Sequence, residues 1–156
     1  MHGDAGMFIG RAKHTVTKDG RVSIPSKMRE AIKKQYDPNE LYLVLLPGNV
    51  VCLYPDEEFQ KLTASWFNNP QGATLSEIMM LERIGGNTEP CKLDGSGRIV
   101  IPPLMRQEAR ITDEVLVIGA LTHIEIWDPG LWEWNQKQTQ AGLDRFKAWP
   151  TQPGIG

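Results

Sequence analysis

Cysteine is scarce in this chain. Its 156 residues include two cysteines, Cys52 and Cys91, which stand far apart in unlike contexts. A disulfide framework or a Cys-x-x-Cys metal site therefore has no support, and the favoured interpretation is a reduced, buried cysteine that behaves as a small hydrophobic residue. His2, His14 and His123 form no ligand spacing with either cysteine, so the sequence predicts no metal site.

Long apolar runs and enzyme motifs are also missing. No apolar run reaches 18 residues, and the first six residues lack a basic stretch followed by an apolar one. The sequence thus predicts neither a membrane span nor a signal peptide, and we expect a cytosolic protein. A nucleophile with its base, a paired-carboxylate site and a phosphate-binding loop do not occur at recognisable spacing. We therefore predict no enzyme activity and no cofactor, and no small-molecule substrate is evident.

What the chain does contain is an internal repeat. The stretch G-R-V-S-I-P-S-K-M-R at 20–29 returns as G-R-I-V-I-P-P-L-M-R at 97–106, with six identical positions at a constant offset of 77. Similarity continues beyond this motif, because residues 40–59 align with 113–132. The chain is therefore built from two copies of one unit. Since a copy of about half the chain is marginal on its own, we expect both copies to share one core.

Each copy is predicted to contain a hairpin, a short helix, two apolar strands and a further helix. The first hairpin should lie within residues 11–24, and the second within 91–101. Pro25 and Pro102 should each occupy the first turn of a helix, because proline needs no hydrogen bond there. The predicted organisation is a flexible extension at 1–6, a first repeat with a helical connector at 7–86, a second repeat with a C-terminal helix at 87–149, and a disordered tail at 150–156.

Two helix starts can be placed from their capping residues. Thr74 and Glu77 are spaced as a capping box, and Asp128 is a predicted N-cap before Pro129. In the helix that follows, Trp132 and Trp134 cannot share one face. We therefore expect one of these tryptophans in the core and the other at a subunit contact.

Positive charge follows the repeated motif. Residues 10–34 hold eight basic and two acidic side chains, whereas residues 35–91 hold two basic and eight acidic ones. Residues 92–111 are basic again, and residues 112–156 are acidic. The net charge of −2 therefore combines a basic footprint with an acidic remainder. Such a footprint can attract phosphate on one face of the molecule.

Each predicted hairpin tip carries an arginine directly after a turn glycine, Arg21 after Gly20 and Arg98 after Gly97. A two-stranded ribbon fits the major groove of DNA, where arginine can bond guanine O6 and N7 together. Arg21 and Arg98 are therefore predicted to read bases. The alternative is that each arginine pairs with a nearby carboxylate and merely holds its turn, but two copies in a basic setting favour DNA binding.

Other basic residues have predicted roles around these arginines. For Arg29 and Arg106, which lie inside the predicted helices, bracing of the hairpin and phosphate contact are equally favoured. The predicted phosphate contacts are Arg11, Lys13, Lys18 and Lys27.

The doubled G-R-hydrophobic-x-I-P-x-x-x-R stretch, with L-Y-P or I-W-D at a later strand end, resembles the MraZ family of bacterial transcriptional regulators in the AbrB and SpoVT class. The resemblance runs from about Met7 to the region of Trp149. It implies an α+β fold in which both copies interleave as an intrachain pseudo-dimer, a swapped-hairpin AbrB-like barrel with peripheral helices. It also implies a homo-oligomeric ring that binds double-stranded DNA at short direct repeats in its own promoter, upstream of the division and cell-wall gene cluster. The implied location is cytoplasmic and nucleoid-associated.

The family signature of an aspartate followed four positions later by an arginine is present as Asp94 and Arg98, so the resemblance implies that Asp94 orients Arg98. In the first copy Arg21 matches, but Thr17 stands at the aspartate position, and Asp19 is close enough in sequence to substitute for it. The alternative function is an antitoxin-like protein-interaction module with the same hairpin fold. Such antitoxins generally carry one hairpin and a long disordered arm.

Overall fold

The structure, a computed structural model, describes residues 7–67 and 74–147. The predicted extension at 1–6 and tail at 150–156 lie outside these ranges. In chain order the elements are β1 (Arg11–Thr15), β2 (Arg21–Ser23), α1 (Ser26–Gln35), β3 (Leu41–Leu46), β4 (Val50–Pro55), α2 (Asp56–Phe67), α3 (Leu75–Gly86), β5 (Thr88–Cys91), β6 (Arg98–Val100), α4 (Pro103–Glu108), β7 (Glu114–Gly119), β8 (Ile124–Trp127) and α5 (Pro129–Lys147). The α+β class is confirmed.

The strands form one six-stranded antiparallel sheet and one two-stranded ribbon. The order in the sheet is β1-β7-β8-β4-β3-β5, and the ribbon pairs β2 with β6. Strands of the two copies exchange partners, because β1 pairs with β7 while β5 pairs with β3. The two copies also meet at the centre of the sheet, where β4 pairs with β8. The strand order therefore reads the same when the two copies are interchanged.

Two expectations about the strands are corrected. The hairpin expected within residues 11–24 is reduced to its tip, where Val16 forms a single bridge with Val22 before β1 leaves to pair with β7. The hairpin expected within residues 91–101 is likewise reduced to a turn, because β5 pairs with β3. β2 instead pairs with β6, which lets both short strands bury a side chain in one core. The sheet is also open and not a closed barrel, since β1 and β5 are its edges and the ribbon is a separate sheet.

The helix starts follow the sequence closely. Thr74 and Glu77 form the expected capping box. Asp128 Oδ2 accepts a hydrogen bond from the backbone N–H of Leu131 at 2.9 Å. Pro25 and Pro102 lie one position earlier than expected. They are the N-cap residues of α1 and α4, with extended ψ angles of 143° and 149°. A proline fits this position because its missing N–H would have no partner within the helix.

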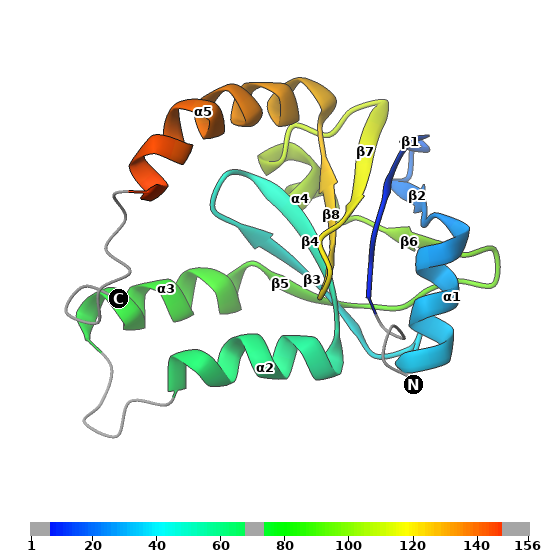
Figure 1. The fold of residues 1–156 in the computed structure, drawn as a ribbon. Helices are drawn as coiled ribbons and strands as arrows, with labels where there is room; N and C mark the ends of the chain where they lie inside the picture. Colours follow the sequence, from blue (N-terminus) through cyan, green and yellow to red (C-terminus); the bar gives the residue numbers. More distant parts are fainter. Residues whose placement is uncertain (1–6, 68–73, 148–156) are drawn as a thin grey trace.

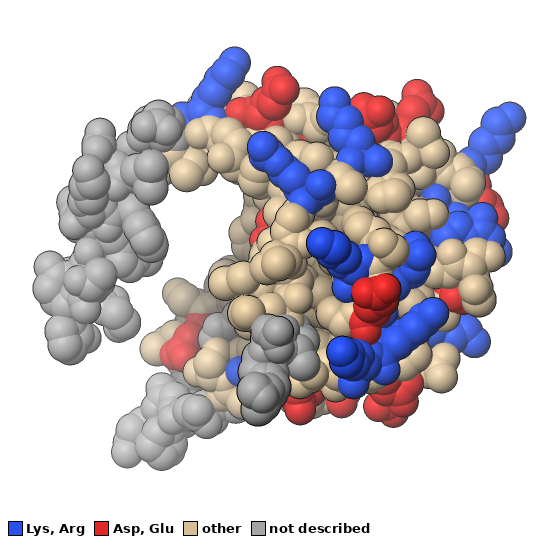
Figure 2. All heavy atoms as spheres, turned by 45° about the vertical axis from the view of Figure 1, so that its right-hand side comes forward, with Lys and Arg blue, Asp and Glu red and all other residues tan. Residues whose placement is uncertain are grey.

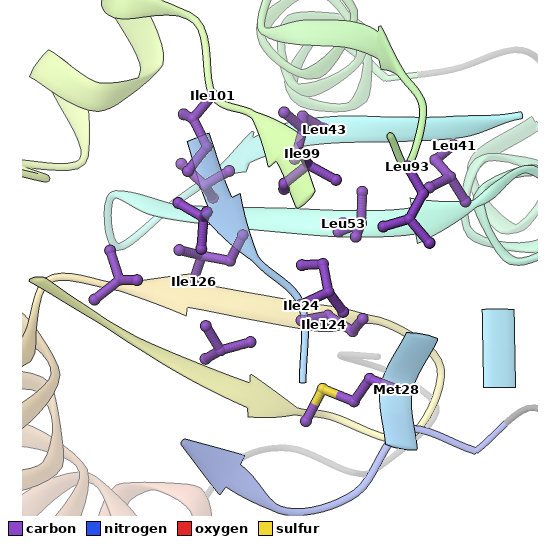
Figure 3. Packing of buried hydrophobic residues seen from close by; sticks show 14 of the residues in the cluster. Ile24, Met28, Leu41, Leu43, Leu53, Leu93, Ile99, Ile101, Ile124 and Ile126 are labelled. Carbon is purple, nitrogen blue, oxygen red and sulfur yellow. The ribbon is translucent and has the colours of Figure 1, made fainter. Parts of the chain in front are cut away.

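The main core lies between the sheet and the ribbon. Figure 3 shows apolar side chains of both copies packed together in this cluster. Val22 and Ile24 of the first copy share it with Ile99 and Ile101 of the second, so the expected common core is confirmed. Met28 of α1 and Met105 of α4 are also core residues.

A second, smaller cluster covers the other face of the sheet. It contains Cys52 and Trp127 from the strands and packs against Phe59 of α2, Ile84 of α3 and Trp132 of α5. The helices are accordingly divided: α1 lies beside the ribbon and β1, whereas α2, α3 and α5 extend on the opposite side (Figure 1). Within residues 7–67 and 74–147, none of the helices could span a bilayer.

The two faces of the ribbon predict different responses to truncation at adjacent positions. Ile99→Ala should lower the free energy of unfolding by about 2–5 kcal/mol, because Ile99 is 1% exposed and the change leaves a cavity. Val100→Ala should change it by less than about 1 kcal/mol, because Val100 is 45% exposed on the outer face. Urea denaturation followed by circular dichroism measures both values. Equal losses would show that the ribbon does not present one face to the core.

Candidate nucleic-acid interface

The ribbon places both candidate base-reading arginines on one outer face. Val22 lies opposite Ile99, and both side chains are buried. Because successive side chains of a strand point to opposite faces, the flanking residues point outward. Arg21 lies opposite Val100, and Arg98 lies opposite Ser23. Arg21 and Arg98 are thus diagonal neighbours across the ribbon, a relation that separates α-carbons by about 7–8 Å.

In the second copy, one carboxylate organises the turn before Arg98. Asp94 Oδ1 accepts the backbone N–H of Ser96 at 2.8 Å and that of Arg98 at 2.9 Å. Asp94 Oδ2 lies 3.3 Å from Arg98 Nε, within the distance of an ion pair. The backbone N–H of Arg98 lowers the pKa of Asp94, so this carboxylate is charged at neutral pH.

In the first copy, two side chains make the contacts that Asp94 makes alone. The Thr17 hydroxyl accepts the backbone N–H of Arg21 at 2.9 Å, and Asp19 Oδ2 lies 3.3 Å from Arg21 Nη1. The Thr17 hydroxyl also donates to the Asp19 carboxylate and lowers its pKa. Asp19 is therefore in place as the expected substitute. Each arginine side chain is 35% exposed, so both guanidinium groups are held by a carboxylate and still reach the surface.

The two helix arginines brace the turns. Arg29 Nη1 donates to the carbonyl of Ile24 at 2.7 Å, and Arg106 Nε donates to the carbonyl of Ile101 at 2.9 Å. Arg106 Nη1 also lies 3.4 Å from the carbonyl of Lys18 in the other copy's turn. Of the two roles left open by the sequence, these contacts favour bracing.

Each brace packs closely on a glycine of the opposite copy. A β-carbon added to Gly97 would lie 2.2 Å from Arg29 Cδ, and one added to Gly20 would lie 2.7 Å from Arg106 Nε. Both glycines have positive φ, 77° and 85°, which other residues rarely adopt. Glycine is therefore required at these turns for its backbone conformation and for the space it leaves to arginine.

Four other cations predicted to contact phosphate are exposed. Arg11 and Lys13 alternate along β1 with half-buried residues, Lys18 lies in the first turn, and Lys27 lies on α1. Figure 2 shows lysine and arginine side chains, with acidic groups between them, on the side of the molecule where α1 and the ribbon lie. Lys18 and Lys27 therefore lie on elements next to the ribbon, whereas Arg11 and Lys13 share the sheet face of their β7 partners Ile118 and Leu116, which is the helix-covered face.

The fold also brings together three polar residues that the sequence analysis did not connect. Cys52 on β4 lies opposite Glu125 on β8, and His123 stands just before β8. One potential ligand atom from each residue lies within 4.8 Å of the others. A signal for this cluster existed, because the alignment of 40–59 with 113–132 places Cys52 at the position of Glu125, and equivalent residues meet where the copies pair.

Known proteins resemble this chain along most of its length. A protein from Syntrophobacter fumaroxidans named "Transcriptional regulator MraZ" is 33% identical over 148 residues, which cover 95% of this chain and 97% of the relative. The chain belongs to the MraZ family. Residues 84–148 also match the profile of the family described as "MraZ protein, putative antitoxin-like".

Two further MraZ relatives come from other bacteria. The one from Thermoanaerobacter sp. (strain X514) is 31% identical, with 90% of this chain and 94% of the relative covered. The one from Shewanella violacea is 29% identical, with 88% and 90% covered. Both are named "Transcriptional regulator MraZ". The family expected from the doubled motif is thereby confirmed.

The bracing contacts predict opposite outcomes for two glycines of the same turn. Gly97→Ala should lower the free energy of unfolding by about 1–3 kcal/mol, because alanine strains the positive φ and displaces Arg29. Gly95→Ala is the matched control, since its added β-carbon meets nothing within 4 Å and its φ is not in the positive range; it should be neutral within about 1 kcal/mol. Urea denaturation measures both, and similar stability of the two variants would argue against the brace.

Proposed function

We propose that this chain is a sequence-specific DNA-binding transcriptional regulator that reads bases with Arg21 and Arg98. The observation that supports it best is the placement of both guanidinium groups on the outer face of one two-stranded ribbon. A ribbon of this width can enter the major groove, and an arginine there can bond guanine through two atoms. The name of the relatives, transcriptional regulator, is consistent with this activity.

The neighbouring residues give the arginines a defined direction. Asp94 orients Arg98, and the pair of Thr17 and Asp19 orients Arg21. A guanidinium group has five N–H donors, so an ion pair through one nitrogen leaves others for a base. Holding a long side chain before binding also reduces the entropy that is lost when DNA binds.

In this proposal, phosphate contacts come from exposed cations of the first turn and α1, Lys18 and Lys27, and from exposed cations of the edge strand β1, Arg11 and Lys13. They fix the position of the protein on the duplex and supply the part of the affinity that depends on salt. Asp19 and Asp94 lie among them and are each paired with an arginine, so their negative charge is partly balanced locally.

The two copies act, in this proposal, as an interleaved pseudo-dimer of swapped-hairpin units. The exchange of edge strands between copies and the β2–β6 pairing support it. The exchange relates two equivalent arginines. One chain therefore presents the pair of base-reading arginines that two chains of a single-copy protein would present together. The division into repeats at 7–86 and 87–149 stays a prediction.

We further propose that chains assemble into a homo-oligomeric ring that binds direct repeats in the gene's own promoter, at the division and cell-wall gene cluster, in the nucleoid-containing cytoplasm. Apolar side chains on α3 support assembly, because Leu75, Ile78 and Met79 are 44–74% exposed. Trp134 on α5 is exposed, whereas Trp132 packs edge-on against Trp127. Trp132 is half-buried beside the smaller core cluster and is not a fully buried core residue as expected, and the subunit contact of Trp134 remains a proposal.

An antitoxin-like role in capturing a protein partner is the second candidate, and the words "antitoxin-like" in the description of the matching family are consistent with it. The salt dependence of the binding affinity distinguishes the two functions. Binding through phosphate contacts lowers the logarithm of the affinity by about 0.9 per contact for each decade of salt concentration. Capture of a protein partner has no such fixed dependence.

Removing a base-reading arginine tests the main proposal. Arg21→Ala and Arg98→Ala should each lower the preference for the promoter site over scrambled DNA by about 1–3 kcal/mol, because a guanine contact is lost. Fluorescence anisotropy with both DNAs measures the preference, and circular dichroism with light scattering checks fold and assembly. Lys137→Ala, which removes one exposed cation from α5, is the control and should bind like the wild type.

Lys13→Ala distinguishes phosphate contact from base reading. It should weaken binding to both DNAs equally and reduce the salt slope by about one.

If Arg21→Ala and Arg98→Ala both keep the full preference for the promoter site, the ribbon does not read bases.

Assembly through α3 predicts binding by avidity. Wild-type protein should bind two or three tandem sites at least about a hundredfold more tightly than one site. The double variant I78E/M79E should be smaller by light scattering and lose this advantage, while it keeps weak binding to one site. Ser76→Glu adds a charge at an exposed polar position of α3 and is the matched control. Equal affinity of the wild type for one, two and three sites would contradict the proposal.

A further inference from the structure

Cys52, His123 and Glu125 converge on the helix-covered face of the sheet. Cys52 and Glu125 are direct partners in the pairing of β4 with β8, and His123 is two residues before Glu125. The Cys52 Sγ, one imidazole nitrogen and one carboxylate oxygen all lie within 4.8 Å of one another. A thiol, an imidazole and a carboxylate are the three side-chain types that bind zinc in proteins.

The remaining polar atoms of this cluster are already held by neighbours. Trp127 Nε1 donates to Glu125 Oε1 at 2.8 Å, and His123 Nδ1 lies 3.0 Å from the Thr122 hydroxyl. The Tyr54 ring stacks on the His123 ring, with centroids 4.5 Å apart and planes 12° apart. His123 Nε2 and Glu125 Oε2 are thereby turned toward each other at 3.0 Å. Metal-binding histidines and carboxylates are typically oriented in this way by outer partners.

We propose that Cys52, His123 and Glu125 bind one divalent transition-metal ion of the zinc class. In a tetrahedral zinc site, bonds of about 2.0–2.3 Å place ligand atoms about 3.3–3.6 Å apart. The histidine and glutamate atoms, 3.0 Å apart, are already near this separation, and the thiol has to approach by at most about 1.5 Å. The soft thiolate and the imidazole favour zinc, copper or cobalt over magnesium and calcium, which prefer oxygen ligands.

The charges of the cluster suit a divalent ion. A thiolate and a carboxylate neutralise its two positive charges, so the filled site adds no net charge beside the apolar cluster. The contact with His123 lowers the pKa of Glu125, which is therefore anionic at neutral pH. Burial raises the pKa of the Cys52 thiol, so the ion has to displace a proton, and binding should weaken as the pH falls. Three protein ligands leave a fourth position for water.

A metal ion here would join the two copies of the repeat. Cys52 belongs to the first copy, and His123 and Glu125 belong to the second. The alignment places Val50 at the position of His123, so exchange of the copies does not create a second site of this kind. The ion would lie on the opposite face of the sheet from the ribbon, and we expect it to stabilise the fold without taking part in base reading.

Titration of the full chain with Co²⁺ tests the site, since cobalt replaces zinc and its thiolate complexes absorb light characteristically. We expect one Co²⁺ per chain, a thiolate-to-cobalt band, and displacement by Zn²⁺. Cys52→Ser should abolish the band, and His123→Gln or Glu125→Gln should weaken binding at least tenfold. Cys91→Ser and His14→Gln are the matched controls for the second cysteine and for a histidine on β1, and both should retain the band.

A second measurement keeps the proposal testable even if Cys52→Ser, a change at a buried position, does not fold. His123 is partly exposed, so His123→Gln should keep the wild-type circular dichroism spectrum. Zn²⁺ should raise the unfolding temperature of the wild type and of Cys91→Ser but not that of His123→Gln. The proposal is overturned if wild-type protein gives no thiolate band at millimolar Co²⁺, if the band survives in Cys52→Ser, or if Zn²⁺ stabilises His123→Gln as strongly as the wild type.

Discussion

The antiparallel pairing of β2 with β6 is the interaction on which the rest of the molecule depends. Each strand has three residues and could not stand alone, so each requires the equivalent strand of the other copy. The pairing continues past the strands, where Ile24 N–H donates to the Gly97 carbonyl at 3.0 Å and Ile101 N–H donates to the Gly20 carbonyl at 2.9 Å. It buries Val22 and Ile99 and, by alternation, turns Arg21 and Arg98 outward on one face.

The two turns beside this ribbon show that geometry can be kept while its chemistry changes. In one turn a single aspartate accepts the arginine N–H and faces the guanidinium group. In the other, a threonine hydroxyl takes the first role and an aspartate two residues later takes the second. What both turns retain is the glycine with positive φ and the arginine brace from the opposite copy. The backbone and the brace therefore restrict these turns more than the identity of the carboxylate does.

Local features of the fold could be predicted from the sequence, whereas the pairing between the copies could not. The helix caps at Thr74 and Asp128 depend on residues close in sequence, and both were found where the pattern placed them. The two apolar strands predicted for each copy are likewise present, as the pairs β3–β4 and β7–β8. The partner of β1 depends on a strand more than a hundred residues away in sequence. The meeting of Cys52 with Glu125 has the same origin, because it follows from the β4–β8 pairing and not from sequence spacing.

The division of the molecule into two faces explains how an acidic chain can present a basic surface. The ribbon and basic α1 lie on one side of the sheet, whereas acidic α2 lies on the other (Figure 1). Packed layers are about 10 Å apart, so a charge on α2 is separated from the ribbon by about two layers. The screening length at physiological salt is about 8 Å. A phosphate at the ribbon therefore experiences mainly the nearby cations, and the net charge of −2 does not decide what this face binds.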